Sequence, residues 1–390
     1  MAGTDTEAAS VLEAVRAVVP TLRENGKDGE DRRWISDENV ELLDKAGVFR
    51  TGVPARFGGL EFSVPQQIDL LLEIARGCGS TGWVSEGWIT GAWMIRLFPD
   101  EAQEEVYAGG TARVSGGFTP SGTLVPTEGG YLLNGTWRFT TGCRGADWNL
   151  AATNLQLPDG TVQQALTVLP IADLTLDDDW HTMAAAGTGS STTVATDVFV
   201  PEHRVIDMAE AFATGGGAPT APGQGRDYGL ISVVMAESTA TLIGMAQGTY
   251  ELFQERVHRP ISYTTWQDQA EHPLTQIQVA TAAAQIAAAR GLLAAQAGLV
   301  QRRADAGQSL TSQERAELRG QCGYAVQLAK EATHTLFNAS GASAIQRSLP
   351  IQRFFRDVQG ISMHAMMTPD ANLEVYGRVL LGLDPNTPFL

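Results

Sequence analysis

The sequence has little cysteine and no long uninterrupted apolar run. Its 390 residues contain three cysteines, Cys78, Cys143 and Cys322, which are odd in number and far apart. This pattern favours neither a disulfide framework nor a zinc cluster, and a reducing, cytoplasmic location is expected. The most apolar long window, residues 279–300, is rich in alanine and interrupted by Arg290. It therefore predicts a buried helix rather than a membrane span.

Basic residues are scarce as well. The chain has 27 lysines and arginines against 44 aspartates and glutamates, which gives a formal charge of −17 at pH 7. Such a charge repels nucleic acid and anionic membrane surfaces, so neither is an expected partner. The first residues, 1–19, lack the basic start and apolar core of a signal peptide and predict an amphipathic helix.

Several common catalytic motifs are missing. The sequence contains no G-x-S-x-G elbow, no H-E-x-x-H pair and no P-loop. The stretch "GTGSST" at 187–192 lacks a third glycine and follows no apolar strand, so it is not a dinucleotide fingerprint. The six histidines are scattered and the acidic run 177–179 lacks the rest of a calcium loop. No metal site is therefore expected.

The hydrophobic pattern of the sequence changes along the chain. Residues 1–112 predict an α-helical domain, with Ser36 and Ser63 as helix caps. Residues 113–228 predict a small antiparallel β domain, because short alternating runs are separated by turn signals at Gly129-Gly130 and Asn134-Gly135. The glycine- and proline-rich segment 213–227 predicts a loop.

Residues 229–390 predict a C-terminal four-helix bundle. The helical patterns are alanine-rich and long, and they cover 229–258, 275–306, 312–338 and 350–383. Thr311 and Glu314 form a capping box at the start of the third helix. The fold class is thus α+β, in the order α domain, β domain, α bundle.

Four stretches in register resemble the acyl-CoA dehydrogenase superfamily over essentially the whole chain. They are "VPARFGGLE" at 53–61, "GGYLLNGTWRFTTGCRGADW" at 129–148, "GTGSSTTVATDVFVP" at 187–201 and "SLPIQRFFRDVQG" at 348–360. The resemblance implies a flavin between the β domain and the bundle, in a homotetramer. The superfamily contains dehydrogenases with a tightly bound flavin and two-component monooxygenases that receive reduced flavin from a separate reductase.

The C-terminal stretch distinguishes these two groups. The dehydrogenase pattern has a catalytic glutamate after tyrosine, where this chain has Gly377 after Tyr376. Glu374 is near, but three residues upstream corresponds to about 60° around a helix. The stretch instead resembles two-component (group D) hydroxylases, with Arg356-Asp357, then His364, then a Tyr-Gly-Arg ending. By this resemblance His364 lies on a helix as the catalytic acid or base, and Arg356-Asp357 is a structural ion pair.

The same resemblance implies the remaining site residues. Thr140 has a catalytic role in holding a flavin C4a-hydroperoxide through a hydrogen bond at the flavin N5 edge. The implied cofactor contacts are Thr140, Thr141, Trp180, Gly187, Ser190, Arg356 and, toward a neighbouring subunit's cofactor, Arg259. Substrate contacts are expected at Gly91 and at the aromatic residues Trp88, Trp93 and Phe118, with Trp83 nearby, which could stack on a flat substrate or equally fill the junction of the α and β parts. Cys143 could line the pocket or simply be buried. Many such hydroxylases have a histidine where this chain has Gly91.

The sequence therefore predicts the oxygenase component of a two-component flavin-dependent monooxygenase. It would use reduced FMN or FAD and dioxygen to hydroxylate an aromatic or polyketide-like small molecule. N-oxygenation of an amine, such as an amino sugar, is an open alternative because of Gly91. Further alternatives are an acyl-CoA dehydrogenase and a non-catalytic scaffold of the same fold. The residues distinguish neither FMN from FAD nor one substrate from another.

Overall fold

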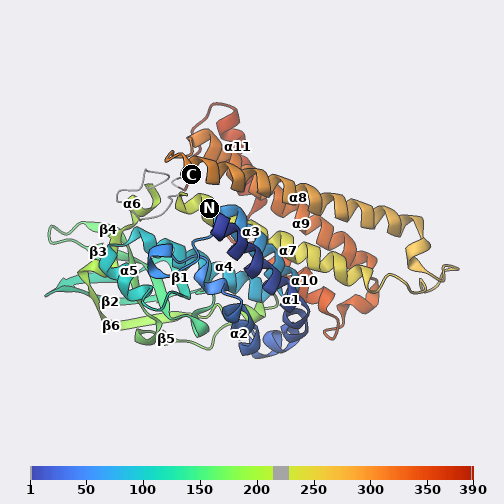
Figure 1. Cartoon of the computed structure of the whole chain (residues 1–390), viewed down its shortest axis with the longest axis horizontal. Helices are drawn as coiled ribbons and strands as arrows, with labels where there is room; N and C mark the ends of the chain where they lie inside the picture. The colour runs from blue at the N-terminus through green and yellow to red at the C-terminus, as the bar shows by residue number, and fades with distance from the viewer. Residues whose placement is uncertain (1, 214–227, 388) are drawn as a thin grey trace.

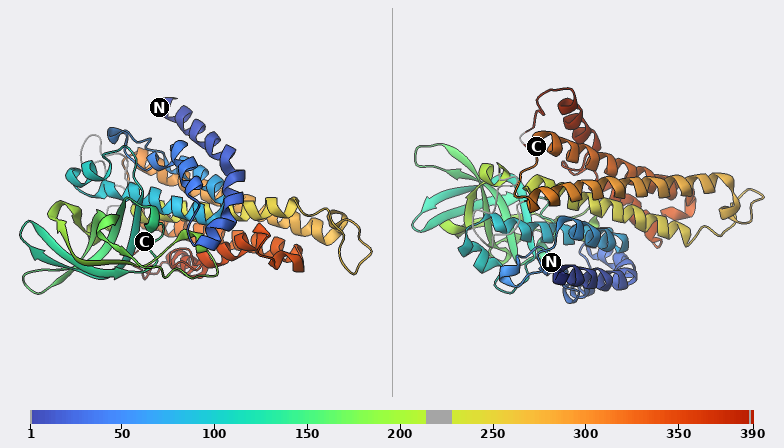
Figure 2. Two further views of the ribbon diagram at one scale, coloured as in Figure 1. Left: turned by 90° about the horizontal axis from the view of Figure 1, so that it is seen from below. Right: turned by 45° about the horizontal axis from the view of Figure 1, so that its top comes forward.

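The computed structural model describes residues 2–213, 228–387 and 389–390, so the predicted loop at 213–227 lies outside the described residues apart from residue 213. A seven-stranded sheet forms one end of the molecule, and long C-terminal helices extend away from it (Figure 1). The N-terminal helices pack alongside both parts (Figure 2). The predicted α+β class, with a β part between two helical parts, is confirmed.

The N-terminal part is helical, as predicted. Its helices are α1 (Ala2–Arg32), α2 (Asp37–Lys45), α3 (Val64–Gly77), α4 (Gly79–Met94) and α5 (Asp100–Val106). Ser63 caps α3 through a complete capping box with Gln66. Ser36 is the N-cap of α2, but its side chain makes no capping hydrogen bond.

The middle part is a sheet with one parallel pair. Its strands are β1 (Val114–Thr127), β2 (Gly130–Trp137), β3 (Trp148–Gln156), β4 (Val162–Pro170), β5 (Thr175–Leu176), β6 (Thr193–Pro201) and β7 (Val205–Asp207). Their order is β5-β6-β2-β1-β3-β4-β7. Strand β1 pairs with β3 in parallel, so the purely antiparallel prediction was wrong for this pair. A parallel pair needs a crossover, and the chain makes it through β2 and the residues that follow.

One of the two predicted turns is a turn. Gly129 has φ +77 between β1 and β2, where a left-handed conformation suits glycine. Asn134-Gly135 instead lies inside β2, at a register shift in the pairing with β6. The extra residue of this bulge is on β6, where Thr196 and Asp197 lie opposite Asn134. Gly135 is required by close packing instead, because a Cβ there would lie 2.5 Å from the Gly122 Cα atom.

In the residues that the structure describes, five α-helices follow the short helix α6 (Met208–Ala213). They are α7 (Leu230–Gln254), α8 (Pro273–Asp305), α9 (Ser312–Ala339), α10 (Pro350–Ile361) and α11 (Pro369–Leu380). The predicted single helix 350–383 is therefore two helices. Pro369 begins the second one, and the residue before a proline is kept out of the helical conformation, as the extended Thr368 shows.

The helices that precede the sheet in the sequence and those that follow it share one hydrophobic core. Leu71 of α3, Trp88 of α4, Met245 of α7 and Ala325 of α9 belong to the same buried cluster. The sheet has a smaller cluster of its own around Trp137. The division at residues 112 and 228 thus follows the change of secondary structure, while packing joins the first part to the third.

Two helices are long and apolar enough to cross a membrane by length and composition alone. In α7, 89% of the apolar window is buried inside the protein, as in a core helix. In α8 only 22% is buried. The window predicted to be buried at 279–300 therefore lies mostly on the surface of the single chain.

Candidate active site

Helix α4 brings the parts of the candidate site together. It packs against β1 on one side and against α7 on another. All its residues are buried except Trp83 and Gly87, which are partly exposed. Trp83, Glu86, Gly87 and Thr90 follow the i, i+3, i+4, i+7 spacing of one helix face. We call these four residues the open face of α4.

The turn after β2 approaches this face. A Cβ placed on Gly87 would meet only the Thr141 Cγ2 atom within 4 Å, at 3.8 Å. Thr141 is partly exposed, and its hydroxyl lies 2.9 Å from the Ser190 hydroxyl. The absent side chain at Gly87 therefore leaves Thr141 accessible from the helix.

Thr140 points the other way. Its side chain is completely buried, and its hydroxyl donates to the Trp137 carbonyl at 3.3 Å. Its backbone N–H donates to the Ser191 carbonyl at 3.2 Å. The implied flavin contact of Thr140 is thus not compatible with this structure, because both of its donors are used inside the protein. Thr140 holds the turn in place and Thr141 presents the accessible hydroxyl.

The glycine-containing segment 187–190 packs against the turn that carries Thr140 and Thr141. Ser190 is buried and hydrogen-bonded to both Thr141 and Thr188. A Cβ on Gly187 would lie 3.0 Å from the Ser80 Cβ of α4, so this glycine serves close packing. Cys143 is also buried, which raises the pKa of its thiol to about 11 and makes it an inert packing residue.

Exposed apolar side chains lie beside the turn. Phe139 is 70% exposed and its ring meets the edge of Trp180 at 5.6 Å. The Trp180 indole N–H donates to the Ala185 carbonyl at 3.0 Å, which fixes the ring. Met183, two residues before Ala185, is 77% exposed. Phe139 and Met183 therefore present apolar side chains to the surface of the single chain near the turn.

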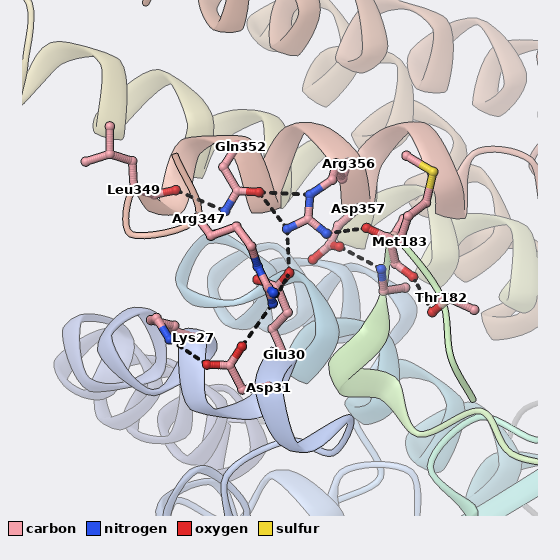
Figure 3. A network of polar contacts seen from close by, with 12 residues as sticks. Lys27, Glu30, Asp31, Thr182, Met183, Arg347, Leu349, Gln352, Arg356 and Asp357 are labelled. Atoms are coloured by element: carbon pink, nitrogen blue, oxygen red, sulfur yellow. Dashed lines mark hydrogen bonds and ion pairs between the residues drawn. The ribbon is translucent and has the colours of Figure 1, made fainter. Parts of the chain in front are cut away.

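Arg356 joins α10 to two other segments (Figure 3). Its guanidinium donates to Glu30 of α1 at 2.7 Å, to Gln352 of its own helix, and to the Met183 carbonyl. These acceptors occupy the N–H groups through which Arg356 was expected to contact the cofactor. Arg356 is therefore a support of the site in this structure.

Asp357 has partners different from those of Arg356, so the predicted ion pair between them is not formed. Its carboxylate accepts a hydrogen bond from the Ala185 backbone N–H at 2.7 Å (Figure 3). Burial raises its pKa to about 6, and the nearby Arg353 and Arg356 act against that rise. Asp357 thereby anchors the segment that carries Met183 and Trp180.

His364 lies in the turn between α10 and α11, not on a helix as predicted. Its ring meets the Trp83 ring edge to face, with centroids 5.8 Å apart. The Met366 backbone N–H donates to His364 Nδ1 at 3.4 Å. His364 is exposed at the surface of the single chain, and the protein atoms packed around the rest of its ring lower the pKa of the imidazole by desolvation. The neutral ring then carries its proton on Nε2, which suits it to donate.

The four implied substrate contacts do not gather on the open face. Trp88 is fully buried, and its indole N–H donates to the Gly142 carbonyl at 3.1 Å. A Cβ on Gly91 would lie 2.2 Å from the Val114 carbonyl oxygen, so close packing excludes any side chain there. Phe118 lies on β1 and is 46% exposed. Trp93 is buried, and its indole N–H has no partner.

Arg259 lies just beyond the C-terminal end of α7. Its guanidinium donates to the Ser340 carbonyl, to the Ser343 hydroxyl at 3.1 Å and to Gln269 at 3.2 Å. Desolvation lowers its pKa, with the nearby Arg256 adding to that effect. In one chain Arg259 therefore ties the loop after α9 to the loop after α7.

The sequence analysis missed two buried glutamates. Glu86 on α4 and Glu237 on α7 are 6% and 2% exposed and share Thr90 between them. A signal was present, because Glu86 is the one charged residue of α4, a helix that is otherwise apolar or small on every side. Among the described residues, no group of three or more metal-binding side chains is found.

The comparisons with known proteins agree with this geometry. Family models for the N-terminal and C-terminal domains of acyl-CoA dehydrogenase match residues 5–115 and 237–369. The solved structure of XiaF from Streptomyces in complex with FADH2 and glycerol has a TM-score of 0.94 with 29% identity, over 100% of this chain and 99% of that one. The fold is thus that of the acyl-CoA dehydrogenases.

Relatives in sequence show which group of proteins with this fold the chain resembles. The oxygenase subunit HsaA of a flavin-dependent monooxygenase from Mycobacterium tuberculosis is 31% identical over 97% of both chains. The oxygenase component of an FADH2-dependent resorcinol hydroxylase from Rhizobium is 30% identical over 95% of this chain and 94% of the relative. The chain belongs to the oxygenase components of the two-component flavin-dependent monooxygenases. It is an enzyme that uses reduced flavin, as predicted.

Proposed function

We propose that the enzyme uses FADH2 and dioxygen to hydroxylate a small aromatic compound that carries a ring O–H or N–H group. One observation carries the proposal: His364, Trp83, Gly87 and Thr141 converge from three parts of the chain around one accessible helix face. Relatives support the substrate class, since their names include p-hydroxyphenylacetate 3-hydroxylase and indole-3-acetate monooxygenase, at 28% and 29% identity.

The residues at this face fit a flat, partly polar ring. Thr141 would hydrogen bond the polar edge of the flavin, and Phe139 with Trp180 would cover its apolar surface. Reduced flavin supplies the two electrons that activate dioxygen for transfer of one oxygen atom. His364 would donate its Nε2 proton to the oxygen atom that leaves as water, while Trp83 holds the substrate ring beside it.

The structure weakens the grounds for the alternatives. N-oxygenation was considered because Gly91 replaces an expected histidine, and the Val114 carbonyl leaves no room for a side chain there. The dehydrogenase alternative needs a carboxylate base near Tyr376. Glu374 is exposed, and its carboxylate forms an ion pair with Arg378 at 3.4 Å on the same helix.

The proposed assembly is a homotetramer that receives FADH2 from a separate reductase in the cytoplasm. Support comes from α8, whose exposed surface carries an apolar hollow bordered by Thr281, Ala284, Ala288, Leu292 and Tyr324. A second copy of this helix would cover such a face. Arg259 would then lie near the cofactor of a neighbouring subunit.

The test is turnover with a flavin reductase, NADH and FAD. We expect hydroxylated product from phenols or indoles and none from amino sugars, with product measured by mass spectrometry per NADH consumed. Product from an amino sugar alone would support N-oxygenation. Reduction of an artificial electron acceptor by an acyl-CoA, without NADH, would support a dehydrogenase, and no product from any of these compounds would contradict the hydroxylase proposal.

A further inference from the structure

Two carboxyl groups face each other inside the protein between α4 and α7. The Ser238 hydroxyl donates to Glu86 Oε1 at 2.7 Å, and the Thr90 hydroxyl donates to Glu237 Oε2. Thr90 also lies 3.5 Å from Glu86 Oε1. In the part of the chain that the structure describes, these partners are hydroxyl groups, and no lysine, arginine or histidine is among them.

Such a pair is costly to bury. Desolvation raises the pKa of Glu86 to about 7 and that of Glu237 to about 8, and the charge of Glu86 adds to the rise at Glu237. A well-packed apolar pair would avoid this cost, so buried carboxyl groups without cations are candidates for a functional role. Burial thus favours the protonated form of each carboxyl group, which can donate a hydrogen bond as well as accept one.

The pair lies on the open face of α4. Glu86 is one helical turn from Trp83, and Thr90 is one turn further. Glu86 and Thr90 keep 6% and 5% of their surface exposed, whereas Val84 and Trp88 on the other side keep none. Glu86 and Thr90 therefore lie in line with Trp83 along this face and are nearly enclosed by the protein.

Two further residues, Trp93 on α4 and Val234 on α7, lie in line with the carboxyl pair. Trp93 is one turn beyond Thr90, is 6% exposed, and has an indole N–H that is buried without a partner. On α7, Val234 is partly exposed one turn before Ser238, in a helix segment that is otherwise buried. An unpartnered buried donor one helical turn from Thr90 and two turns from Glu86 is a group that a polar atom of a bound molecule would satisfy.

We infer that Glu86 and Glu237 form the inner end of the substrate site, where they bind the O–H or N–H group of an aromatic substrate whose ring lies against Trp83 and His364. The inference rests on the proposed hydroxylase function. From Trp83 to Thr90 the helix rises about 10 Å, the length of two to three fused rings. The site would therefore favour a substrate larger than a single ring.

The chemistry balances with the established activity. Dioxygen, two electrons from reduced flavin and two protons convert an aromatic C–H bond to C–OH and release one water. As the ring carbon accepts the oxygen atom, the substrate O–H or N–H proton moves to a carboxylate of the pair. The ring carbon then loses its own proton, and the proton on the carboxyl group returns to the substrate heteroatom.

Ligand binding without oxygen tests the inference apart from turnover. Indole and 1-methylindole, and phenol and anisole, are pairs that differ in the donor group. We expect the wild-type enzyme to bind the first of each pair about tenfold to a hundredfold more tightly, as followed by tryptophan fluorescence under nitrogen. Glu237→Gln and Glu86→Gln should lose this preference. Ser85→Ala, a buried change on the other side of α4, should keep it.

The outcomes separate the two proposals. Equal affinity for both members of each pair in the wild type, or an unchanged preference in both glutamine variants, would overturn the inference. A preserved preference with no hydroxylated product from any aromatic compound would overturn the proposed function alone. If a glutamine variant does not fold, Thr90→Val and Ser238→Ala remove the hydroxyl groups that orient the pair, and the preference should weaken severalfold. An unchanged preference in these would then overturn the inference.

Discussion

The two sides of helix α4 use the same residue types for different purposes. On one side Trp88 is fully buried, its indole N–H bonded to Gly142, and Gly91 lies against the backbone of β1. On the other side Trp83 is partly exposed against His364, and Gly87 leaves space beside Thr141. Tryptophan and glycine thus serve packing on one side and access on the other.

This difference shows why residue type alone misplaced the substrate contacts. A tryptophan with all its partners inside the protein is a core residue, whatever motif contains it. A glycine beside a carbonyl group is required by packing, whereas a glycine beside open space can admit a ligand. Position around the helix, in steps of about 100°, decides between these uses.

The largest expected effect comes from removing the packed tryptophan. Trp88→Ala should lower the free energy of unfolding by about 3–5 kcal/mol, because it leaves a large cavity and an unpaired carbonyl at Gly142. Trp83→Ala should cost about 1 kcal/mol or less and instead reduce product formation. Urea unfolding followed by circular dichroism measures both. Equal losses of stability would contradict the division of α4 into two sides.

His364 tests the accessible side directly. His364→Ala should reduce product per reduced flavin oxidised by about a hundredfold, because the donated proton is lost, with little change in stability. His258→Ala is a suitable control, since that side chain is exposed and paired with Asp268 beyond the end of α7. Hydrogen peroxide release should rise as product falls. Normal product yield in His364→Ala would remove the proposed proton donor.

The buried carboxyl pair gives a pH test that needs no substrate. Because the pKa values of Glu86 and Glu237 are raised on folding, the folded state binds more protons, and stability falls as pH rises from about 5 to about 8. Glu237→Gln should flatten this fall and stabilise the protein at pH 8 by on the order of 2 kcal/mol. Thermal unfolding at pH 5 and pH 8 provides the measurement, and a parallel pH profile in the variant would count against the raised pKa.

The smallest expected effect separates the two neighbouring threonines. Thr141→Val should lower product per reduced flavin about tenfold through one lost hydrogen bond to the cofactor. Thr140→Val should keep that ratio and lower the free energy of unfolding by about 1 kcal/mol, since its hydroxyl bonds only to buried protein groups, the Trp137 carbonyl and the Thr193 hydroxyl. Turnover and urea unfolding of both variants check the assignment. The reverse pattern would restore Thr140 as the flavin contact.

Local signals predicted the elements of the fold well. The capping boxes at Ser63 and Thr311 depend on residues three apart, and both form in the structure. The parallel pairing of β1 with β3 was not predictable in this way, because strand order depends on packing between distant segments. The break at Pro369 could have been predicted, since proline restricts the residue before it.

The candidate site was predicted only in part. His364 and the turn containing Thr141 were named from the resemblance, and the structure brings both to α4. Which threonine is accessible depends on strand β6, whose Thr193 lies 3.2 Å from the Thr140 hydroxyl. The carboxyl pair joins residues about 150 positions apart along the chain, as the separation of 152 between Glu86 and Ser238 shows. No pattern within one segment reveals such a contact.

The bond from Arg356 to Glu30 has a consequence for how the protein is handled in the laboratory. Through Arg356, helix α1 near the start of the chain is connected to the segment around Met183, which is about 150 residues further along the sequence. A protein shortened past residue 32 would keep every residue that faces the open side of α4. It would nevertheless lose the Glu30 partner of Arg356, and the segment that carries Met183 and Trp180 would be held less firmly. Loss of activity in such a truncated protein would therefore not contradict the catalytic assignments.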